Sequence, residues 1–209
     1  MPLVLYDYWR SSAAYRVRIA LALKGVAYER VAVNLIAGDQ RGAANRAVNP
    51  QGFVPTLVAD GVAMTQSLAI VDWLDATCPD PPLIPRDPAA RARAWAMALT
   101  IAADIHPIDN LRVLKRLEAQ FGADQAARDA WYVHWVGEGL DALEQMAPAT
   151  RFLGGATPGV ADLCLVPQMY NARRFGMTTT RWPRLAAADA AACALAAFAD
   201  AHPDRVRPA

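Results

Sequence analysis

The sequence has few cysteines, almost no net charge and no long apolar run. The three cysteines among its 209 residues, Cys78, Cys164 and Cys193, are widely spaced and form neither a metal-ligand pattern nor a disulfide framework. A formal charge of +1 argues against nucleic acid or an anionic membrane surface as the main partner. We find no signal-peptide profile and no apolar run long enough to span a bilayer. These absences predict a cytoplasmic protein with no metal site, no membrane partner and no nucleic-acid partner.

The first eighty residues alternate between short apolar strands and helices. The pair Asp60-Gly61 predicts a tight hairpin, and residues 36–52 are polar and Gly-rich, as in a loop. The order β-α-β followed by β-β-α is typical of a thioredoxin-like α/β domain, in which right-handed crossovers make the first two strands parallel. The expected strands cover residues 3–8, 28–33, 54–58 and 62–65, and the expected helices run from the serines at 11 and 12 to about Lys24 and from Gln66-Ser67 onward.

The remainder of the chain is expected to be all-helical. Five prolines between residues 78 and 88 mark a semi-rigid linker. We therefore predict a thioredoxin-like domain over residues 1–80, a linker over 81–88 and a helical domain over 89–209. The helical stretches expected there are 89–120 with a break at Pro107, 124–146, 162–175 with a break at Pro167, and 184–201, followed by a polar tail at 203–209.

The segment around Ser11 and Ser12 carries the strongest chemical signal. Two serines follow a strand and precede a helix, where a hydroxyl caps free backbone N–H groups. Arg10 lies at the entrance to this helix, and such a helix N-terminus suits an anion or a thiolate. The plain alternative is an ordinary capped helix with solvated arginines at positions 10, 16 and 18.

The pattern Ser11-Ser12-x-x-x-Arg16-Val17-Arg18-Ile19-Ala20-Leu21 resembles the signature of the zeta class of glutathione transferases, which includes maleylacetoacetate and maleylpyruvate isomerases. The family pattern has cysteine after the two serines, whereas this chain has Ala13, so any thiol must come from the cofactor. The resemblance implies the two-domain glutathione transferase fold, a homodimer and glutathione as cofactor. It also implies Ser11, Ser12 and Arg10 as catalytic residues.

The resemblance further places glutathione on Val54, Pro55, Gln66 and Ser67, in addition to Ser11. We expect the Val54-Pro55 bond to be cis, as in thioredoxin-like domains, although an edge-strand proline would also fit. Free N–H groups and the Ser67 hydroxyl would hold a carboxylate at the start of the helix. A plain helix cap explains Ser67 equally well, but it explains Gln66 less well.

In the helical half, the segment His106-Pro107-Ile108-Asp109-Asn110-Leu111-Arg112 is unusually polar. A lone histidine beside a helix kink is more often structural, but the segment resembles the pocket of zeta-class isomerases. By that resemblance His106 and Asn110 contribute to cofactor binding, and His106, Arg112, Arg174 and Arg10 bind substrate. Arg173 is expected to be solvated, and Asp162 is expected to be a structural capping residue.

Arginines around a thiolate favour a small dicarboxylate substrate, because guanidinium groups bind carboxylates with paired hydrogen bonds. The implied reaction is the glutathione-dependent cis–trans isomerisation of maleylacetoacetate to fumarylacetoacetate, a step of tyrosine catabolism. Three alternatives stay open. They are maleylpyruvate isomerisation, general transferase or peroxidase activity on apolar electrophiles, and a non-catalytic binding role.

Overall fold

The computed structural model of the protein describes residues 2–208, and the chain forms two compact units. The first comprises Met1–Ile84 together with Cys193–Ala209, and the second comprises Pro85–Ala192. The C-terminal seventeen-residue stretch therefore groups with the first unit, whereas the sequence-based division by chain order grouped it with the helical domain. No helix among the described residues is long and apolar enough to cross a membrane.

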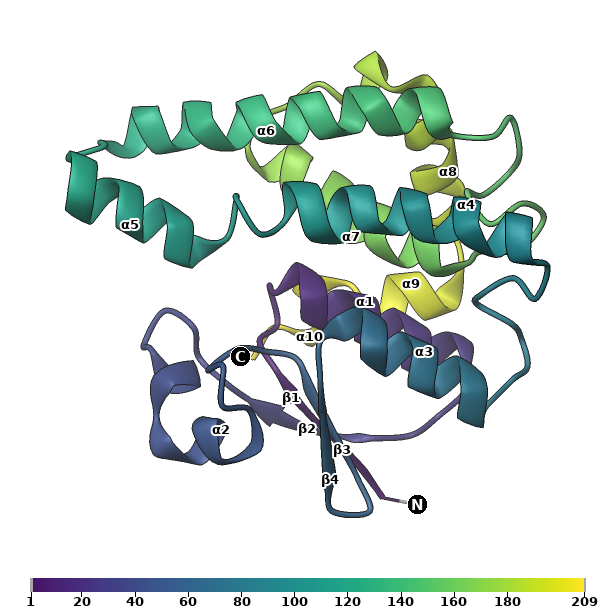
Figure 1. Cartoon of the computed structure of the whole chain (residues 1–209), viewed down its shortest axis with the longest axis horizontal. Coiled ribbons are helices and arrows are strands. Elements are labelled where there is room, and N and C mark those ends of the chain that lie inside the picture. The colour runs from purple at the N-terminus through teal and green to yellow at the C-terminus, as the bar shows by residue number, and fades with distance from the viewer. Residues whose placement is uncertain (1, 209) are drawn as a thin grey trace. The chain divides into compact units, whose positions relative to one another are not determined.

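The first unit is built on a four-stranded sheet of order β2-β1-β3-β4 (Figure 1). The parallel pairing of β1 and β2 and the antiparallel β3–β4 hairpin both confirm the sequence prediction. The hairpin turn uses Asp60 and Gly61 with φ of 48° and 81°, values typical of a tight two-residue turn. The strands are β1 (Leu3–Asp7), β2 (Glu29–Ala32), β3 (Thr56–Ala59) and β4 (Val62–Thr65).

Helices α1 (Ser12–Leu23) and α3 (Ser67–Thr77) pack together beside this sheet (Figure 1). Helix α1 is buried along most of its length, as expected for a helix that is apolar on two sides. The expected loop at 36–52 contains the 3₁₀ turn η1 (Asp39–Arg41) and the short helix α2 (Ala43–Val48).

The C-terminal stretch packs on α1 through α9 (Ala196–Asp200), and α10 (Pro203–Val206) packs on α9. Arg18 on α1 donates through Nε to the Ala201 carbonyl (3.1 Å) and pairs through Nη1 with Asp7 (2.7 Å). Arg30 also pairs with Asp7 and donates to the Val206 carbonyl, 3.1 Å away. The plain alternative of a solvated Arg18 is therefore wrong, because its side chain is fully buried and its charge is balanced by Asp7.

The second unit is helical. Helix α4 begins at Pro88 after Asp87, whose side chain accepts from Ala90 N (2.7 Å), and it continues into the π-helical segment η2. Residues 106–110 then leave the helix before α5, which confirms the predicted break at Pro107. The elements are α4 (Pro88–Leu99), η2 (Thr100–Ile105), α5 (Leu111–Phe121), α6 (Gln125–Met146), α7 (Val160–Arg174), the 3₁₀ turn η3 (Thr179–Arg181) and α8 (Pro183–Cys193).

Two helix boundaries differ from the sequence prediction. Helix α7 continues through Pro167 without a break, because every residue from Val160 to Met169 is buried and tertiary packing outweighs one lost hydrogen bond. The expected helix over 184–201 is divided between α8 and α9, and the expected polar tail contains α10. Asp162 has the predicted capping role, since it accepts from the N–H groups of Leu153, Gly154 and Gly159.

Candidate active site

Three segments with candidate functional residues meet at one end of the sheet in the first unit. The strand register decides this, since Thr56 at the start of β3 pairs with Tyr6 near the end of β1 and with Thr65 at the end of β4. The chain enters β3 from Pro55, and it leaves β1 toward Ser11 and β4 toward Ser67. Residues far apart in the sequence thus lie at the same end of the sheet.

Ser11 caps helix α1 in a way that leaves its hydroxyl proton available. Its Oγ accepts from Ala14 N at 3.2 Å, and its backbone is extended at φ −69° and ψ 120°. Because the oxygen accepts in this bond, the O–H can donate to an anion at the helix terminus. The first turn of α1 contains no acidic residue that would occupy this position. Ser12 is buried as the first residue of the helix.

The start of helix α3 is strained and lacks a side-chain cap. Gln66 adopts φ 69° and ψ 114°, a conformation rarely used by residues other than glycine, and its side chain donates to Gln51 (3.0 Å) rather than to the helix. No acidic residue lies in the first turn of α3. Strain held at a helix N-terminus without a cap is typical of a ligand-binding position.

Arg16 supplies a buried positive charge beneath Ser67. Its side chain is 2% exposed, and Nη1 donates to Ser67 Oγ at 3.3 Å. Its Nε and Nη2 have no hydrogen-bond partner within the described residues. The plain alternative of a solvated Arg16 is thus also wrong. A buried guanidinium with free donors beside a helix N-terminus fits an incoming carboxylate.

The Val54–Pro55 peptide bond is cis, which confirms that prediction. Val54 lies in a buried cluster with Tyr8 and Val33, against which Trp9 also packs. Arg10 is half-buried and lies over the Trp9 ring, with its guanidinium carbon 5.3 Å from the ring centroid. The Trp9 side chain therefore contacts both the cluster that contains Val54 and the guanidinium of Arg10.

In the second unit, the polar segment lies between η2 and α5. His106 ends η2, and Asn110 caps α5, with its side chain accepting from Arg112 N at 3.1 Å. The Arg112 side chain is exposed on the first turn of α5. Trp131 Nε1 donates to the Ile108 carbonyl at 3.0 Å, which holds this segment against α6.

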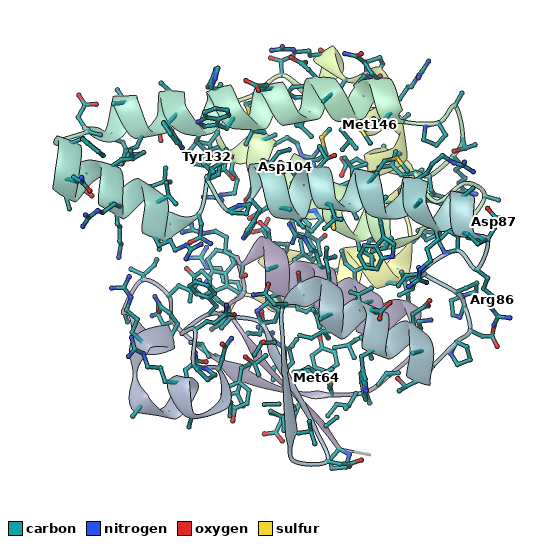
Figure 2. All side chains as sticks on the ribbon, in the orientation of Figure 1. Met64, Arg86, Asp87, Asp104, Tyr132 and Met146 are labelled. Atoms are coloured by element: carbon teal, nitrogen blue, oxygen red, sulfur yellow. The ribbon has the colours of Figure 1, made fainter. Side chains whose placement is uncertain are left out.

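Asp109 is a buried acid that the sequence analysis did not single out. It is 7% exposed, and neither carboxyl oxygen has a hydrogen-bond partner in the described part of the chain. Burial raises the pKa of Asp109 to about 7. The pKa of Tyr132 on α6, labelled in Figure 2, is raised, because burial and the charge of Asp109 outweigh the opposing charge of Arg174. The charges of Asp109 and Arg174 therefore both act on the Tyr132 hydroxyl.

Arg174, at the end of α7, is exposed and donates to Asn171 Oδ1 (3.0 Å). Its guanidinium lies 5.7 Å from the ring centroid of Phe175, which stacks on Tyr132. Arg173 is exposed, as expected, and it also pairs with Asp189 on α8 (2.7 Å). Arg174 thus lies beside the stacked pair of Phe175 and Tyr132, and the binding roles of His106, Asn110, Arg112 and Arg174 remain predictions.

Comparison with known proteins agrees with this geometry. The family model for the N-terminal domain of glutathione S-transferases matches residues 5–82. The maleylacetoacetate isomerase of Rhizobium meliloti is 50% identical, and the alignment covers 98% of each chain. The holo structure of a maleylpyruvate isomerase, described as a bacterial glutathione transferase of the zeta class, is 42% identical with a TM-score of 0.95 and full coverage of both chains.

A third relative carries informative ligands. The maleylacetoacetate isomerase structure from Anaeromyxobacter dehalogenans holds dicarboxyethyl glutathione and citrate in its active site. It is 43% identical, with a TM-score of 0.88, and the match covers 100% of this chain and 97% of that one. This chain belongs to the zeta class of the glutathione transferases.

Proposed function

We propose that this protein is a glutathione-dependent cis–trans isomerase that converts maleylacetoacetate to fumarylacetoacetate. The proposal rests on one observation. The segments that contain Ser11, the cis Val54–Pro55 bond and the Arg16–Ser67 pair lie at the same end of the sheet. Residues 1–80 would form the glutathione-binding domain, with 81–88 as linker and residues of the helical domain binding substrate. The name and ligands of the related isomerases support this assignment.

The first unit offers binding groups for the γ-glutamyl carboxylate, the cysteinyl backbone and the sulfur of glutathione. The uncapped start of α3, with Ser67 and the free donors of Arg16, suits the α-carboxylate of the γ-glutamyl group. Val54, before the cis proline, offers backbone groups to the cysteinyl part of the tripeptide. The Ser11 hydroxyl and the N-terminus of α1 are then left for the sulfur. The proposal also includes Gln66, His106 and Asn110 among the cofactor-binding residues.

When bound, glutathione would supply a thiol for addition to the conjugated cis double bond of the substrate. That bond would then be single and free to rotate, and it would become double again, in the trans form, as the thiol leaves. Ser11 lowers the pKa of that thiol by donating a hydrogen bond to the thiolate, with help from the dipole of α1. Ser12, the buried first residue of α1, stays in the proposal as a second catalytic serine together with Arg10, as the family resemblance implies. A shift of about two pKa units corresponds to about 2.7 kcal/mol, which one charge-assisted hydrogen bond and a helix dipole can provide.

Arginines would hold the two carboxylates of the substrate while its central bond rotates. Arg10, Arg112 and Arg174 are the candidates, with His106 as a further pocket residue. Their permanent charge also stabilises the enolate that forms when the double bond becomes single. The carboxylate ligands of the related isomerase favour this pocket chemistry over one suited to apolar electrophiles.

We further propose a cytoplasmic homodimer acting in tyrosine catabolism. Family membership supports the dimer, and light scattering on the purified protein would test it. Dependence on reduced glutathione and three free cysteines favour a reducing compartment. A monomer at micromolar concentration would contradict the oligomeric part of the proposal without affecting the catalytic part.

The decisive experiment compares Ser11→Ala with Ser11→Thr. Loss of the hydroxyl should lower isomerase turnover at least about tenfold with little change in glutathione affinity, whereas threonine, which keeps a hydroxyl, should retain more activity. Stopped-flow absorbance and calorimetry measure the two quantities. Unchanged turnover in the alanine variant would show that Ser11 does not act on the sulfur.

Maleylpyruvate is the second candidate substrate, since the similar holo structure is that of a maleylpyruvate isomerase. Ratios of kcat/KM for the two keto acids on the same preparation would distinguish the candidates. Turnover of chlorodinitrobenzene at a higher kcat/KM than either acid would instead indicate a general transferase. Failure to bind immobilised glutathione would favour a non-catalytic role.

A further inference from the structure

Two arginines from opposite ends of the chain lie against one tryptophan beside the proposed active site. The guanidinium carbons of Arg10 and Arg207 are 5.3 Å and 5.1 Å from the centroid of the Trp9 ring. Arg207 directly follows α10, and both arginines belong to the first compact unit. The sequence places this residue in a polar tail, so its position beside Trp9 is decided by the fold.

The end of the chain is anchored where it approaches Trp9. The Val206 carbonyl accepts from Arg30 Nη1 at 3.1 Å, and the Ala201 carbonyl accepts from Arg18 Nε at 3.1 Å. Arg18 also donates through Nη2 to the Trp9 carbonyl at 2.9 Å. The same buried arginine thus holds both the residue that carries the ring and the segment that leads to Arg207.

The charges of Arg10 and Arg207 are not compensated within the described residues. Their neighbours Arg18 and Arg30 share the carboxylate of Asp7. By contrast, no carboxylate in residues 2–208 forms an ion pair with Arg10 or Arg207. Two like charges on one aromatic ring, without a counter-ion, attract an external anion.

We propose that Arg207, stacked on Trp9 opposite Arg10 in the chain, adds a second guanidinium to the carboxylate-binding position that the proposed function assigns to Arg10, with the substrate as the source of the carboxylate. The inference deepens the proposed function and rests on it. Arg10 immediately precedes Ser11, whose hydroxyl we assign to the sulfur, so the proposed carboxylate position belongs to the segment that leads into α1. The glycyl carboxylate of glutathione has the same chemistry and is the alternative source.

Calorimetry with succinate separates these sources, because succinate carries two carboxylates but has no double bond to react. Succinate is titrated into glutathione-saturated protein, and glutathione is titrated separately into free protein. Arg207→Ala should weaken succinate binding about fivefold and glutathione binding less than twofold. The dependence of succinate affinity on salt should also decrease in this variant.

Arg205→Ala is the matched control, since Arg205 is an exposed arginine of α10, two residues before Arg207, and among the described residues it does not stack on Trp9. It should leave both affinities unchanged. Arg207→Lys keeps the charge and should fall between the wild type and Arg207→Ala.

Unchanged succinate affinity in Arg207→Ala would overturn the proposal, as would a loss confined to glutathione or an equal loss of both ligands. Calorimetry requires no turnover, so it yields a result even if the isomerase assignment fails. An active isomerase with unaltered succinate binding in Arg207→Ala would overturn only the carboxylate site.

Discussion

Asp109 shows how burial changes the chemistry of a single residue. Its carboxyl group has lost water without gaining a hydrogen-bond partner among the described residues, and its pKa is raised to about 7. The folded chain therefore binds this proton more tightly than the unfolded chain does. The contribution of Asp109 to the free energy of unfolding falls as the pH rises from about 4 to about 7, and it stays low above that range.

Asp109→Asn should remove this pH dependence. The variant should melt several degrees above the wild type at about pH 8, and the difference should shrink toward about pH 5, where the wild-type carboxyl is protonated in the folded state. Calorimetric melts across this range provide the measurement. Asp104→Asn is a suitable control, because Asp104 is an exposed aspartate of the preceding segment, labelled in Figure 2. Parallel pH profiles for wild type and Asp109→Asn would contradict the assignment.

At the scale of secondary-structure elements, the start of α3 combines strain with unused donors. Gln66 holds φ 69°, which costs about 1–3 kcal/mol for a residue with a Cβ. The structure tolerates this cost where the helix N-terminus, Ser67 and Arg16 are brought together. Ligand binding rather than stability explains such a position best.

Gln66→Gly should therefore stabilise the free protein and weaken glutathione binding. Glycine relieves the positive φ, so we expect a higher Tm without ligand, together with an affinity loss from the missing side chain and the looser backbone. Asp60→Gly is the matched control, because Asp60 also has a positive φ, of 48°, but lies in the hairpin turn. It should raise Tm without changing the dissociation constant of glutathione. An equal loss of affinity in both variants would refute a local role for Gln66.

At the scale of the whole molecule, the last residues of the chain complete the first unit. Phe198 is fully buried, and its carbonyl accepts from the Tyr15 hydroxyl of α1 at 3.2 Å. Together with the bond from Arg18 to the Ala201 carbonyl, this contact connects the C-terminal stretch to α1, the helix capped by Ser11, and the Val206 carbonyl connects the same stretch to Arg30 of β2. The end of the chain is thus part of the scaffold of the proposed glutathione site.

Phe198→Ala should destabilise the protein by about 3–5 kcal/mol, because it leaves a cavity against α1. Phe121→Ala should cost less than about 0.5 kcal/mol, since Phe121 is 69% exposed on α5. Urea unfolding measures the free energy of unfolding of each variant, and a fluorescence competition assay measures its affinity for glutathione. Similar stabilities of the two variants would mean that the C-terminal stretch contributes little to the fold.

Local signals in the sequence were sufficient for most of the fold. Ser11, the Asp60-Gly61 turn and the Pro107 break each act through the backbone of their own few residues, so their effects could be predicted without tertiary information. Pro167 failed as a breaker because burial on all sides of α7 outweighs the local preference. The split between α8 and α9 and the short α10 carried no comparably strong signal.

The amino-acid sequence by itself determined the α/β-then-helical order, the zeta-class motif and the identity of the segments around Ser11, Pro55 and Ser67, because periodicity, caps and turns are short-range effects. The register of the strands then brings these segments to one end of the sheet. Tertiary structure alone decided that Arg16 and Arg18 are buried, that Asp109 lies without a partner and that Arg207 reaches Trp9. Burial and the pairing of charges depend on residues distant in the chain. An arginine of the same local pattern can therefore be solvated, paired with an aspartate or held ready for a ligand, and only the folded chain distinguishes these states.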